Sequence, residues 1–382
     1  MPSSRPKIIV NKNTPQAIEV FSMLGDVVGL SSPEFTPDVV RDADILIVRS
    51  ETRVDTRLLE GSSVRFVGTV TIGTDHIDTE YLRSRGIQFA SAPGSNARSV
   101  AEYVCAALFE AWEGRVGGKT LGVVGVGHVG DHVTRMAKVL GMQVLMNDPP
   151  LERSGKKGFC SLDDLMKADA ISIHVPLTKT GPDPTHHLFD KSRIARMKSG
   201  SILINTSRGP VVESNALKNA LSSHHLSAAI LDVWEHEPEI DVDLLKLVLF
   251  GTPHIAGYSL NGRLNAVQMV YEETCGFLGV PAAISPTRDF YHRENITIPS
   301  HLTRAGDIIR FAIKSAYNIR QDNALLRHIH DSPPDKRGKY FSGLRSEYRT
   351  RLEFRHWNVQ VPTAQQHAAE VLRQLGFTVV IS

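Results

Sequence analysis

The sequence predicts an α/β protein with two doubly wound parallel-sheet domains and a small α+β unit in its C-terminal part. Three observations lead to this prediction. The chain has 382 residues, whereas single hydrophobic cores stop growing at ~250–300 residues. Short apolar runs alternate with helical stretches over two long segments, which is typical of parallel sheets with helical crossovers. After Pro281 this alternation ends and a different pattern begins.

The first segment runs from Lys7 to about Ala111 and contains five short apolar runs, as expected for buried strands. These runs are Ile8–Val10, Val27–Leu30, Ile45–Val48, Phe66–Val67 and Phe89–Ala90. We expect helices over Ala17–Leu24 and Asp78–Arg85, and a longer amphipathic helix over Ser95–Trp112. The arrangement predicts a flavodoxin-like domain.

The second segment, from Thr120 to about Pro253, contains six further strand candidates and predicts a Rossmann domain. They are Leu121–Val124, Gln143–Met146, Ala170–Val175, Ser201–Asn205, Ala228–Val233 and Val248–Gly251. A helix around Asn261–Leu278 should then return the chain to the first domain. The predicted boundaries are therefore 1–96 with 255–285 for the first domain, 97–254 for the second and 286–382 for the tail.

The tail has its own order of elements. A helix is expected over Leu302–Arg320 and a strand over Trp357–Val361. Thr363 and Gln366 form a capping-box pattern before a helix that Gly376 should end. Thr378–Ile381 reads as a final strand.

Charge and composition exclude several classes of protein. Lys+Arg 43 against Asp+Glu 41 gives a net charge of +2, so no global field selects nucleic acid or an anionic membrane. No apolar run reaches the ~18 residues of a membrane-spanning helix. The three cysteines Cys105, Cys160 and Cys275 match neither a disulfide framework nor a zinc motif. We therefore expect a cytoplasmic protein without a metal site.

The small net charge hides an asymmetry. Residues 291–382 carry 14 Lys/Arg and 8 Asp/Glu, a net charge of +6, whereas residues 1–290 carry a net charge of −4. The simplest interpretation is a basic helical surface. Alternatively, the tail provides positive charge for an anionic ligand or a partner subunit.

A glycine motif follows the strand candidate Leu121–Val124. Gly125, Gly127 and Gly130 form a G-x-G-x-x-G pattern, with His128 and Val129 inside it, directly before an amphipathic segment. In the dinucleotide-binding turn these glycines permit a tight turn, close approach of the pyrophosphate and close helix–strand packing. The strand–loop–helix context is the one that the motif requires.

An acidic residue stands where such a site needs one. Asp148 lies 18 residues beyond Gly130, after Gln143–Met146, where a carboxylate accepts hydrogen bonds from the adenosine ribose. Its charge would repel a 2′-phosphate, which favours NAD over NADP, although Arg153 lies nearby. The alternative is a plain glycine turn followed by an exposed acid.

Three polar residues follow later strands of the same segment. Arg208, Glu237 and His254 come after successive strand candidates, whose carboxyl ends form the ligand-binding edge of a doubly wound sheet. A neutral imidazole accepts the hydroxyl proton when an alcohol loses hydride, and a neighbouring carboxylate orients the ring. A guanidinium binds a substrate carboxylate through two hydrogen bonds. The set fits oxidation of a 2-hydroxy acid.

Spacing alone does not select these residues. Glu235 and Glu239 compete with Glu237, and His236 competes with His254. Arg208 is equally consistent with a surface ion pair.

The motifs resemble those of the D-isomer-specific 2-hydroxyacid dehydrogenase family. The resemblance rests on 122–130, Asp148, 205–209, 232–238 and His254. It implies that Arg208, Glu237 and His254 are catalytic. It further implies NAD contacts by a set of residues on the strand ends and the glycine turn. This set comprises Gly125, Gly127, His128, Val129, Gly130, Asp148, Val175, Thr206, Ser207, Asp232 and Gly257.

A narrower resemblance within this family covers nearly the whole chain, including 48–50, 66–76, 254–258 and 317–320. It implies oxidation of 4-phospho-D-erythronate to 2-oxo-3-hydroxy-4-phosphobutanoate in vitamin B6 biosynthesis. Ser50, Thr71 and Tyr258 would then contact the substrate, and the tail would be a dimerisation domain that makes the protein a homodimer.

A phosphorylated hydroxy acid is a small substrate with two anionic ends, and Arg208 binds only one of them. Arg49, beside Ser50, is a candidate for the other, and the basic tail could add an arginine from the same or a partner subunit. Two alternatives remain at this point. One is a dehydrogenase of another 2-hydroxy acid, such as phosphoglycerate or glycerate; the other is an NAD-sensing binding protein.

Overall fold

The computed structural model describes residues 5–283, 285 and 293–381. The chain divides into two compact units, each of which is discontinuous in sequence. The first unit comprises Met1–Asn96 and Ser259–His292, and the second comprises Ala97–Tyr258 and Arg293–Ser382. The predicted boundary between residues 285 and 286 lies beside residues that are outside the described part of the chain.

The first unit contains a five-stranded parallel sheet in the order β2-β1-β3-β4-β5. Its strands are β1 (Lys7–Asn11), β2 (Asp26–Leu30), β3 (Ile45–Val48), β4 (Phe66–Thr69) and β5 (Gln88–Ala90). Its helices are α1 (Ala17–Phe21), α2 (Pro37–Val40), α3 (Thr56–Leu59), α4 (Thr79–Ser84) and α12 (Leu260–Leu278).

Successive strand residues in this sheet face opposite layers, as the two-residue period of a strand requires. Ile8 and Val10 pack with Phe21 of α1 and Tyr271 of α12. Ile9 lies in the other cluster, which includes side chains of α2, α3 and α4. Because both faces are covered, the strands are continuously apolar. The strand order reverses between β1 and β3, which is where ligands bind in folds of this type.

The second unit contains a six-stranded parallel sheet in the order β11-β10-β9-β8-β6-β7. Its strands are β6 (Thr120–Val124), β7 (Gln143–Asn147), β8 (Ala170–Ile173), β9 (Ile202–Asn205), β10 (Ala228–Leu231) and β11 (Phe250–Gly251). Its helices are α5 (Ala97–Ala111), α6 (His128–Val139), α7 (Pro149–Arg153), α8 (Leu162–Leu165), α9 (Lys191–Arg196), α10 (Ser214–Ser222) and α11 (Val242–Leu247). The strand order reverses between β6 and β8, beside the glycine motif.

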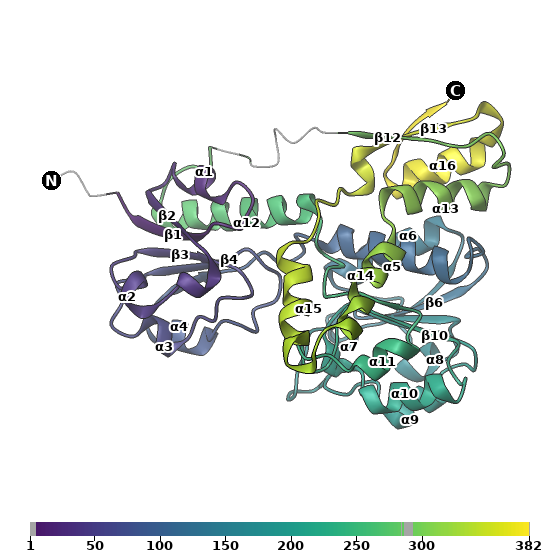
Figure 1. Ribbon diagram of the computed structural model, residues 1–382, viewed down its shortest axis with the longest axis horizontal. Helices are drawn as coiled ribbons and strands as arrows, with labels where there is room; N and C mark the ends of the chain where they lie inside the picture. The colour runs from purple at the N-terminus through teal and green to yellow at the C-terminus, as the bar shows by residue number, and fades with distance from the viewer. Residues whose placement is uncertain (1–4, 284, 286–292, 382) are drawn as a thin grey trace. The chain divides into compact units, whose positions relative to one another are not determined.

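The C-terminal part of the second unit adds a separate three-stranded sheet, β12-β13-β14, which is parallel throughout (Figure 1). Its elements are β12 (Glu294–Thr297), α13 (Ala305–Ala316), α14 (Ile319–Arg327), α15 (Arg337–Ser346), β13 (Trp357–Val361), α16 (Gln366–Leu375) and β14 (Thr378–Ile381). Side chains of α13 and α16 share a core with α5 and α6, which attaches this sheet to the Rossmann sheet.

Four details of the tail differ from the sequence prediction. Helix α15 was not predicted. The helix expected over Leu302–Arg320 is broken, because Tyr317 is extended and the Asn318 side chain caps α14 by accepting a hydrogen bond from the Arg320 amide. Strand β12 was not predicted, since Ile296 is its one buried residue. Helix α16 begins at Gln366, after a 3₁₀ turn over Thr363–Gln365, and therefore later than the capping-box pattern indicates. Gly376 ends it with φ 102°, as predicted.

Candidate active site

The glycine turn joins β6 to α6, and two of its glycines are required by close packing. Gly125 has φ 82°, and a Cβ atom there would lie 2.7 Å from the His174 carbonyl oxygen. A Cβ at Gly130 would lie 2.0 Å from the Gly125 carbonyl oxygen. Any larger residue at either position would force the turn away from the sheet.

Gly127 differs, because a Cβ atom built there meets no protein atom within 4 Å. It is exposed and precedes the first turn of α6, where His128 and Val129 lie. Packing within the protein therefore does not explain this glycine. An open approach to the unpaired N–H groups of a helix N-terminus fits a bound pyrophosphate. The residues of the turn thus fit a dinucleotide.

Asp148 lies at the end of β7 and faces the glycine turn. One carboxylate oxygen accepts a hydrogen bond from the Val126 amide at 2.7 Å, and the other accepts one from the Leu151 amide at 3.0 Å. The nearby cation, Arg153, forms an ion pair with Asp183. The structure therefore holds Asp148 at the turn and engages Arg153 elsewhere, an arrangement that fits an adenosine ribose without a 2′-phosphate.

His174 is a residue of this region that sequence reasoning missed. It follows β8 beside Val175, and its ring contacts Ser172 Oγ at 2.8 Å and Thr206 Oγ1 at 3.2 Å. Burial lowers the pKa of His174 to about 3, so the ring is neutral at ordinary pH. The ring fixes Thr206, one of the predicted cofactor residues, to the neighbouring strand end. No sequence motif marks this histidine.

Arg208 lies on a turn built by Asn205 at the end of β9. The Asn205 side chain accepts hydrogen bonds from the Ser207 amide at 3.0 Å and the Ser207 hydroxyl at 2.8 Å, and donates to the Arg208 carbonyl at 2.9 Å. A Cβ atom at Gly209 would lie 1.9 Å from the Trp234 carbonyl oxygen. The turn that carries Arg208 therefore packs against the loop that leads to Glu237.

Asp232 organises the loop that carries His254. Its buried carboxylate accepts hydrogen bonds from Thr252 Oγ1 at 2.7 Å, the Ile255 amide at 2.8 Å and the Ala256 amide at 2.9 Å. The His254 amide donates to the Asp232 carbonyl at 2.7 Å. These bonds hold His254 at φ 58°, a left-handed conformation that is uncommon for a residue with a side chain.

A second residue, Arg351, also braces this loop. The Arg351 side chain is 2% exposed, and its guanidinium donates to the Ala256 carbonyl at 3.0 Å and to the Ser99 carbonyl at 2.7 Å. It also lies 3.9 Å from the centre of the Tyr317 ring. The C-terminal part of the chain therefore holds the His254 loop directly. This residue was not predicted.

The structure brings Glu237 and His254 together. His254 Nδ1 lies 2.8 Å from one oxygen of the Glu237 carboxylate, and the other oxygen accepts a hydrogen bond from the Trp234 amide. Burial raises the pKa of Glu237, but the charge and hydrogen bond of His254, the Trp234 amide and the charge of Arg345 outweigh it, so the pKa is lowered overall. Glu237 is thus an ionised partner that orients the ring.

The residues that competed with Glu237 and His254 in the sequence either make other contacts or are exposed. Glu235 contacts His187 Nε2 at 2.8 Å and accepts a hydrogen bond from the Ser214 amide at 2.8 Å. His236 and Glu239 are exposed. Of these five side chains, Glu237 and His254 are therefore the acid and the histidine that contact each other, at 2.8 Å. They lie after the last strands of the sheet.

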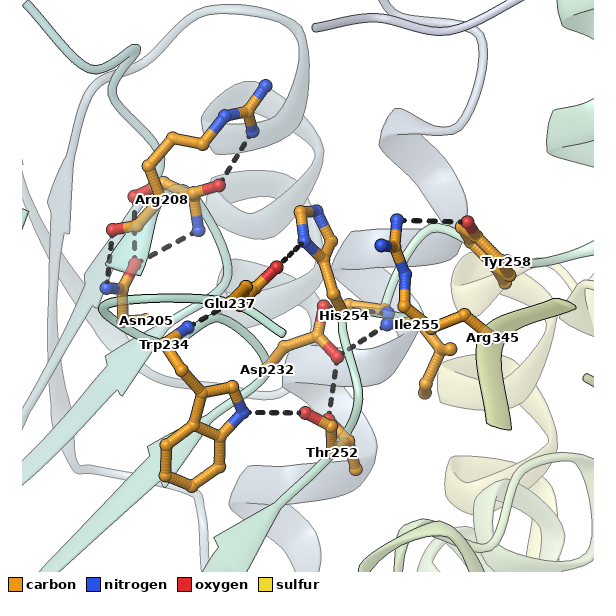
Figure 2. Close-up of polar contacts among 12 residues, drawn as sticks. Asn205, Arg208, Asp232, Trp234, Glu237, Thr252, His254, Ile255, Tyr258 and Arg345 are labelled. Carbon is orange, nitrogen blue, oxygen red and sulfur yellow. Dashed lines mark hydrogen bonds and ion pairs between the residues drawn. The ribbon is translucent and has the colours of Figure 1, made fainter. Parts of the chain in front are cut away.

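An arginine from the tail lies beside this pair. Arg345 on α15 donates a hydrogen bond to the Tyr258 hydroxyl at 3.2 Å and lies 5.8 Å from the centre of that ring. Figure 2 shows the Glu237–His254 pair with Arg208 on one side and with Arg345 and Tyr258 on the other. Gly257, the predicted cofactor contact, directly precedes Tyr258 in the loop. The net positive charge of the tail indicated that this segment could supply an arginine to the site, but it did not identify Arg345.

The remaining predicted substrate residues belong to the first unit. Arg49 and Ser50 follow β3, and Thr71 follows the neighbouring strand β4. Arg49 is 11% exposed and contacts Glu51 at 3.3 Å. The Thr71 hydroxyl lies 2.8 Å from that of Thr69 and donates to the Gly73 carbonyl. These residues share the carboxyl edge of one sheet.

Within 5–283, 285 and 293–381, no group of three or more His, Cys, Asp or Glu side chains could hold a metal ion. In the same residues, no helix combines the length and the hydropathy that crossing a membrane demands.

Comparisons with known proteins agree with the geometry. The family model for the D-isomer specific 2-hydroxyacid dehydrogenase, NAD binding domain, matches residues 101–256. An erythronate-4-phosphate dehydrogenase of Marinobacter nauticus is 38% identical over 98% of this chain and 100% of its own length. One from Klebsiella pneumoniae is 42% identical over 98% of this chain and 98% of its own length. The crystal structure of D-lactate dehydrogenase from Aquifex aeolicus, complexed with NAD and lactic acid, is similar with a TM-score of 0.58 and 27% identity, covering 72% of this chain and 95% of that chain.

Proposed function

Since this chain belongs to the erythronate-4-phosphate dehydrogenases within the D-isomer-specific 2-hydroxyacid dehydrogenase family, we propose that it oxidises 4-phospho-D-erythronate at C2. It is an NAD-dependent oxidoreductase, and the product is 2-oxo-3-hydroxy-4-phosphobutanoate, in the biosynthesis of vitamin B6. The observation that carries the proposal is the partly buried Glu237–His254 pair after the last strands of the Rossmann sheet.

His254 is the proposed general base. Its Nδ1 faces the Glu237 carboxylate at 2.8 Å, which leaves Nε2 to accept the proton of the C2 hydroxyl group. Because the pKa of Glu237 is lowered, this carboxylate is negative at neutral pH and stabilises the imidazolium ion that forms. Asp232 and Arg351 keep the loop, and with it the ring, in one position.

Arg208 is the proposed binding group for the substrate carboxylate. Its turn is fixed by Asn205 and by the close packing of Gly209. A guanidinium keeps its charge at every relevant pH and binds a carboxylate in a planar, two-bonded geometry. The substrate is thereby oriented with C2 toward His254.

NAD, when bound, accepts the hydride that leaves C2. We propose that the glycine turn with His128 and Val129, together with Asp148, Val175, Thr206, Ser207, Asp232 and Gly257, holds it. The open space at Gly127 and the position of Asp148 support this part of the proposal.

The first unit and the tail complete the proposal. Residues 1–96 and 255–285 would form the substrate domain, 97–254 the NAD domain and 286–382 a dimerisation domain of a cytoplasmic homodimer. Val380 and Ile381 are 49% and 41% exposed on β14, the edge strand of the tail sheet. Exposed apolar side chains on a sheet edge support association with a second copy.

The two alternatives have less support. A dehydrogenase of phosphoglycerate or glycerate would need the same catalytic pair, so the near full-length similarity to erythronate-4-phosphate dehydrogenases decides against it. An NAD sensor would have no use for a general base.

The test is a substrate panel with purified protein and NAD, in which 4-phospho-D-erythronate should give the highest kcat/KM with product identified by mass. His254→Ala should abolish turnover while NAD affinity is retained, because the ring acts on the proton and not on the cofactor. Preference for phosphoglycerate or glycerate, or turnover by the variant, would refute the proposal.

A further inference from the structure

We propose that Arg345, supplied by the C-terminal part of the chain, binds the phosphate group of the substrate and so determines the preference for a phosphorylated acid. This inference rests on the function proposed above. It assigns to one residue a role in substrate specificity, in a segment that was expected to form a dimer and, alternatively, to supply positive charge to an anionic ligand.

The position of Arg345 is the first argument. Its guanidinium contacts the hydroxyl of Tyr258, four residues after His254. Its charge also lowers the pKa of Glu237, the partner of His254. Arg345 therefore lies within electrostatic reach of the reacting groups, and Figure 2 places it across His254 from Arg208. A substrate with its C2 at His254 and its carboxylate at Arg208 extends its other end toward Arg345.

The packing of α15 is the second argument. A Cβ atom at Gly338 would lie 2.4 Å from the Glu239 carboxylate and 3.3 Å from the Pro238 ring, so this helix lies directly against the loop that carries Glu237. Arg345 comes seven residues after Gly338, two turns later on the same helix face. Phe341, between them, is fully buried. The helix therefore has a fixed position from which Arg345 reaches Tyr258.

The charge of the substrate requires a second cation in addition to Arg208. The substrate carries a carboxylate and a phosphate, and one guanidinium cannot bind both. A phosphate prefers arginine, whose planar donors match its oxygens, and a neighbouring tyrosine hydroxyl adds a further donor. In the second unit, Arg345 with Tyr258 provides this pair of donors beside the proposed catalytic residues.

The experiment compares 4-phospho-D-erythronate with D-erythronate in the wild type, Arg345→Met, Arg345→Lys and the control Lys339→Met, an exposed cation on the same helix. Arg345→Met should raise KM for the phosphorylated acid about 100-fold, with a change below about threefold for D-erythronate. Arg345→Lys should recover part of the loss, and Lys339→Met should match the wild type. Inorganic phosphate should compete with D-erythronate in the wild type but not in Arg345→Met.

Thermal unfolding and NAD binding separate this result from misfolding, since both should be unchanged in Arg345→Met. Equal losses on the two acids, with a changed pH profile, would show that Arg345 acts on Glu237 instead and would overturn the proposal. Unchanged KM would overturn it as well. If the wild type itself does not oxidise 4-phospho-D-erythronate, the proposed function fails. If the wild type does and Arg345→Met keeps the wild-type preference for the phosphorylated acid, only the role of Arg345 fails.

Discussion

Glu237 holds a negative charge beside the candidate base. Its carboxylate contacts Nδ1 of His254, and the charge and hydrogen bond of His254 contribute to the lowered pKa of Glu237. Glu237→Gln preserves the shape and removes the charge that stabilises the imidazolium ion formed when His254 accepts the proton. We expect kcat/KM at neutral pH to fall by about 10–100-fold. Steady-state kinetics measure the loss, and a kcat/KM equal to that of the wild type would mean that the carboxylate does not assist the base.

A matched change at Glu235 provides the control. Glu235 bonds with His187 and Ser214 and not with His254. Glu235→Gln should therefore leave kcat/KM at the wild-type value.

At the scale of single residues, the sequence predicted the site residues that follow strands. It missed the residues that contact the site from positions far away in the sequence. Glu237 and His254 were candidates because parallel strands deliver their following residues to one edge. Spacing did not separate Glu237 from Glu235. The family resemblance implied Glu237, and the structure shows its contact with His254. Arg351 bonds with Ala256 across 95 residues of sequence, and no periodic pattern encodes such a pair.

The turn between β6 and α6 permits a comparison of two glycines within one element. A Cβ at Gly130 collides with the Gly125 carbonyl, whereas a Cβ at Gly127 meets no protein atom. Gly130→Ala should therefore lower the melting temperature and NAD affinity together. Gly127→Ala should keep the melting temperature of the ligand-free protein and weaken NAD binding alone. Differential scanning calorimetry and titration with NAD measure both effects. Equal NAD affinity in Gly127→Ala and the wild type would contradict the proposed site.

Helix α5 carries a buried carboxyl group that makes stability depend on pH. Burial and the charge of Glu353 raise the pKa of Glu102 to about 8, although Arg98 and Arg351 oppose the shift. An unfolded chain releases this proton near the ordinary glutamate pKa of about 4.3. Between these values the folded chain holds one more proton, so the free energy of unfolding falls as pH rises toward 8.

Glu102→Gln removes this group, and the free energy of unfolding should then fall less between about pH 6 and pH 9 than it does in the wild type. Urea unfolding at several pH values measures the difference. A parallel pH dependence in the two proteins would show that Glu102 titrates normally.

At the scale of elements, strand prediction succeeded where both faces of the strand are buried. Ile45–Val48 was predicted with its exact bounds, because four consecutive buried apolar residues leave no ambiguity. Strand β12 was missed, since it places one buried residue among polar ones. The break between α13 and α14 was also missed, because the apolar spacing continues through Tyr317 while the cap at Asn318 ends the helix.

For the whole molecule, the proposed homodimer predicts a solution mass of twice 42.1 kDa, measurable by light scattering. Val380→Glu places a charge on the exposed edge strand β14 and should shift the equilibrium toward the monomer. Met23→Glu changes a side chain that is 66% exposed in the first unit and should leave the mass unchanged. A monomeric wild type would refute the dimer.

Arg351 links the order of synthesis to the onset of activity. The loop that carries His254 leaves the ribosome 95 residues before the arginine that braces its Ala256 carbonyl. The glycine turn and the strands around it are complete far earlier. In a nascent chain whose Rossmann sheet has formed, His254 therefore lies on a loop that Asp232 already holds and that Arg351 does not yet contact. The loop is braced by both residues only in a chain that extends through Arg351, so we expect dehydrogenase activity to begin after Arg351 has been synthesised and has folded into place.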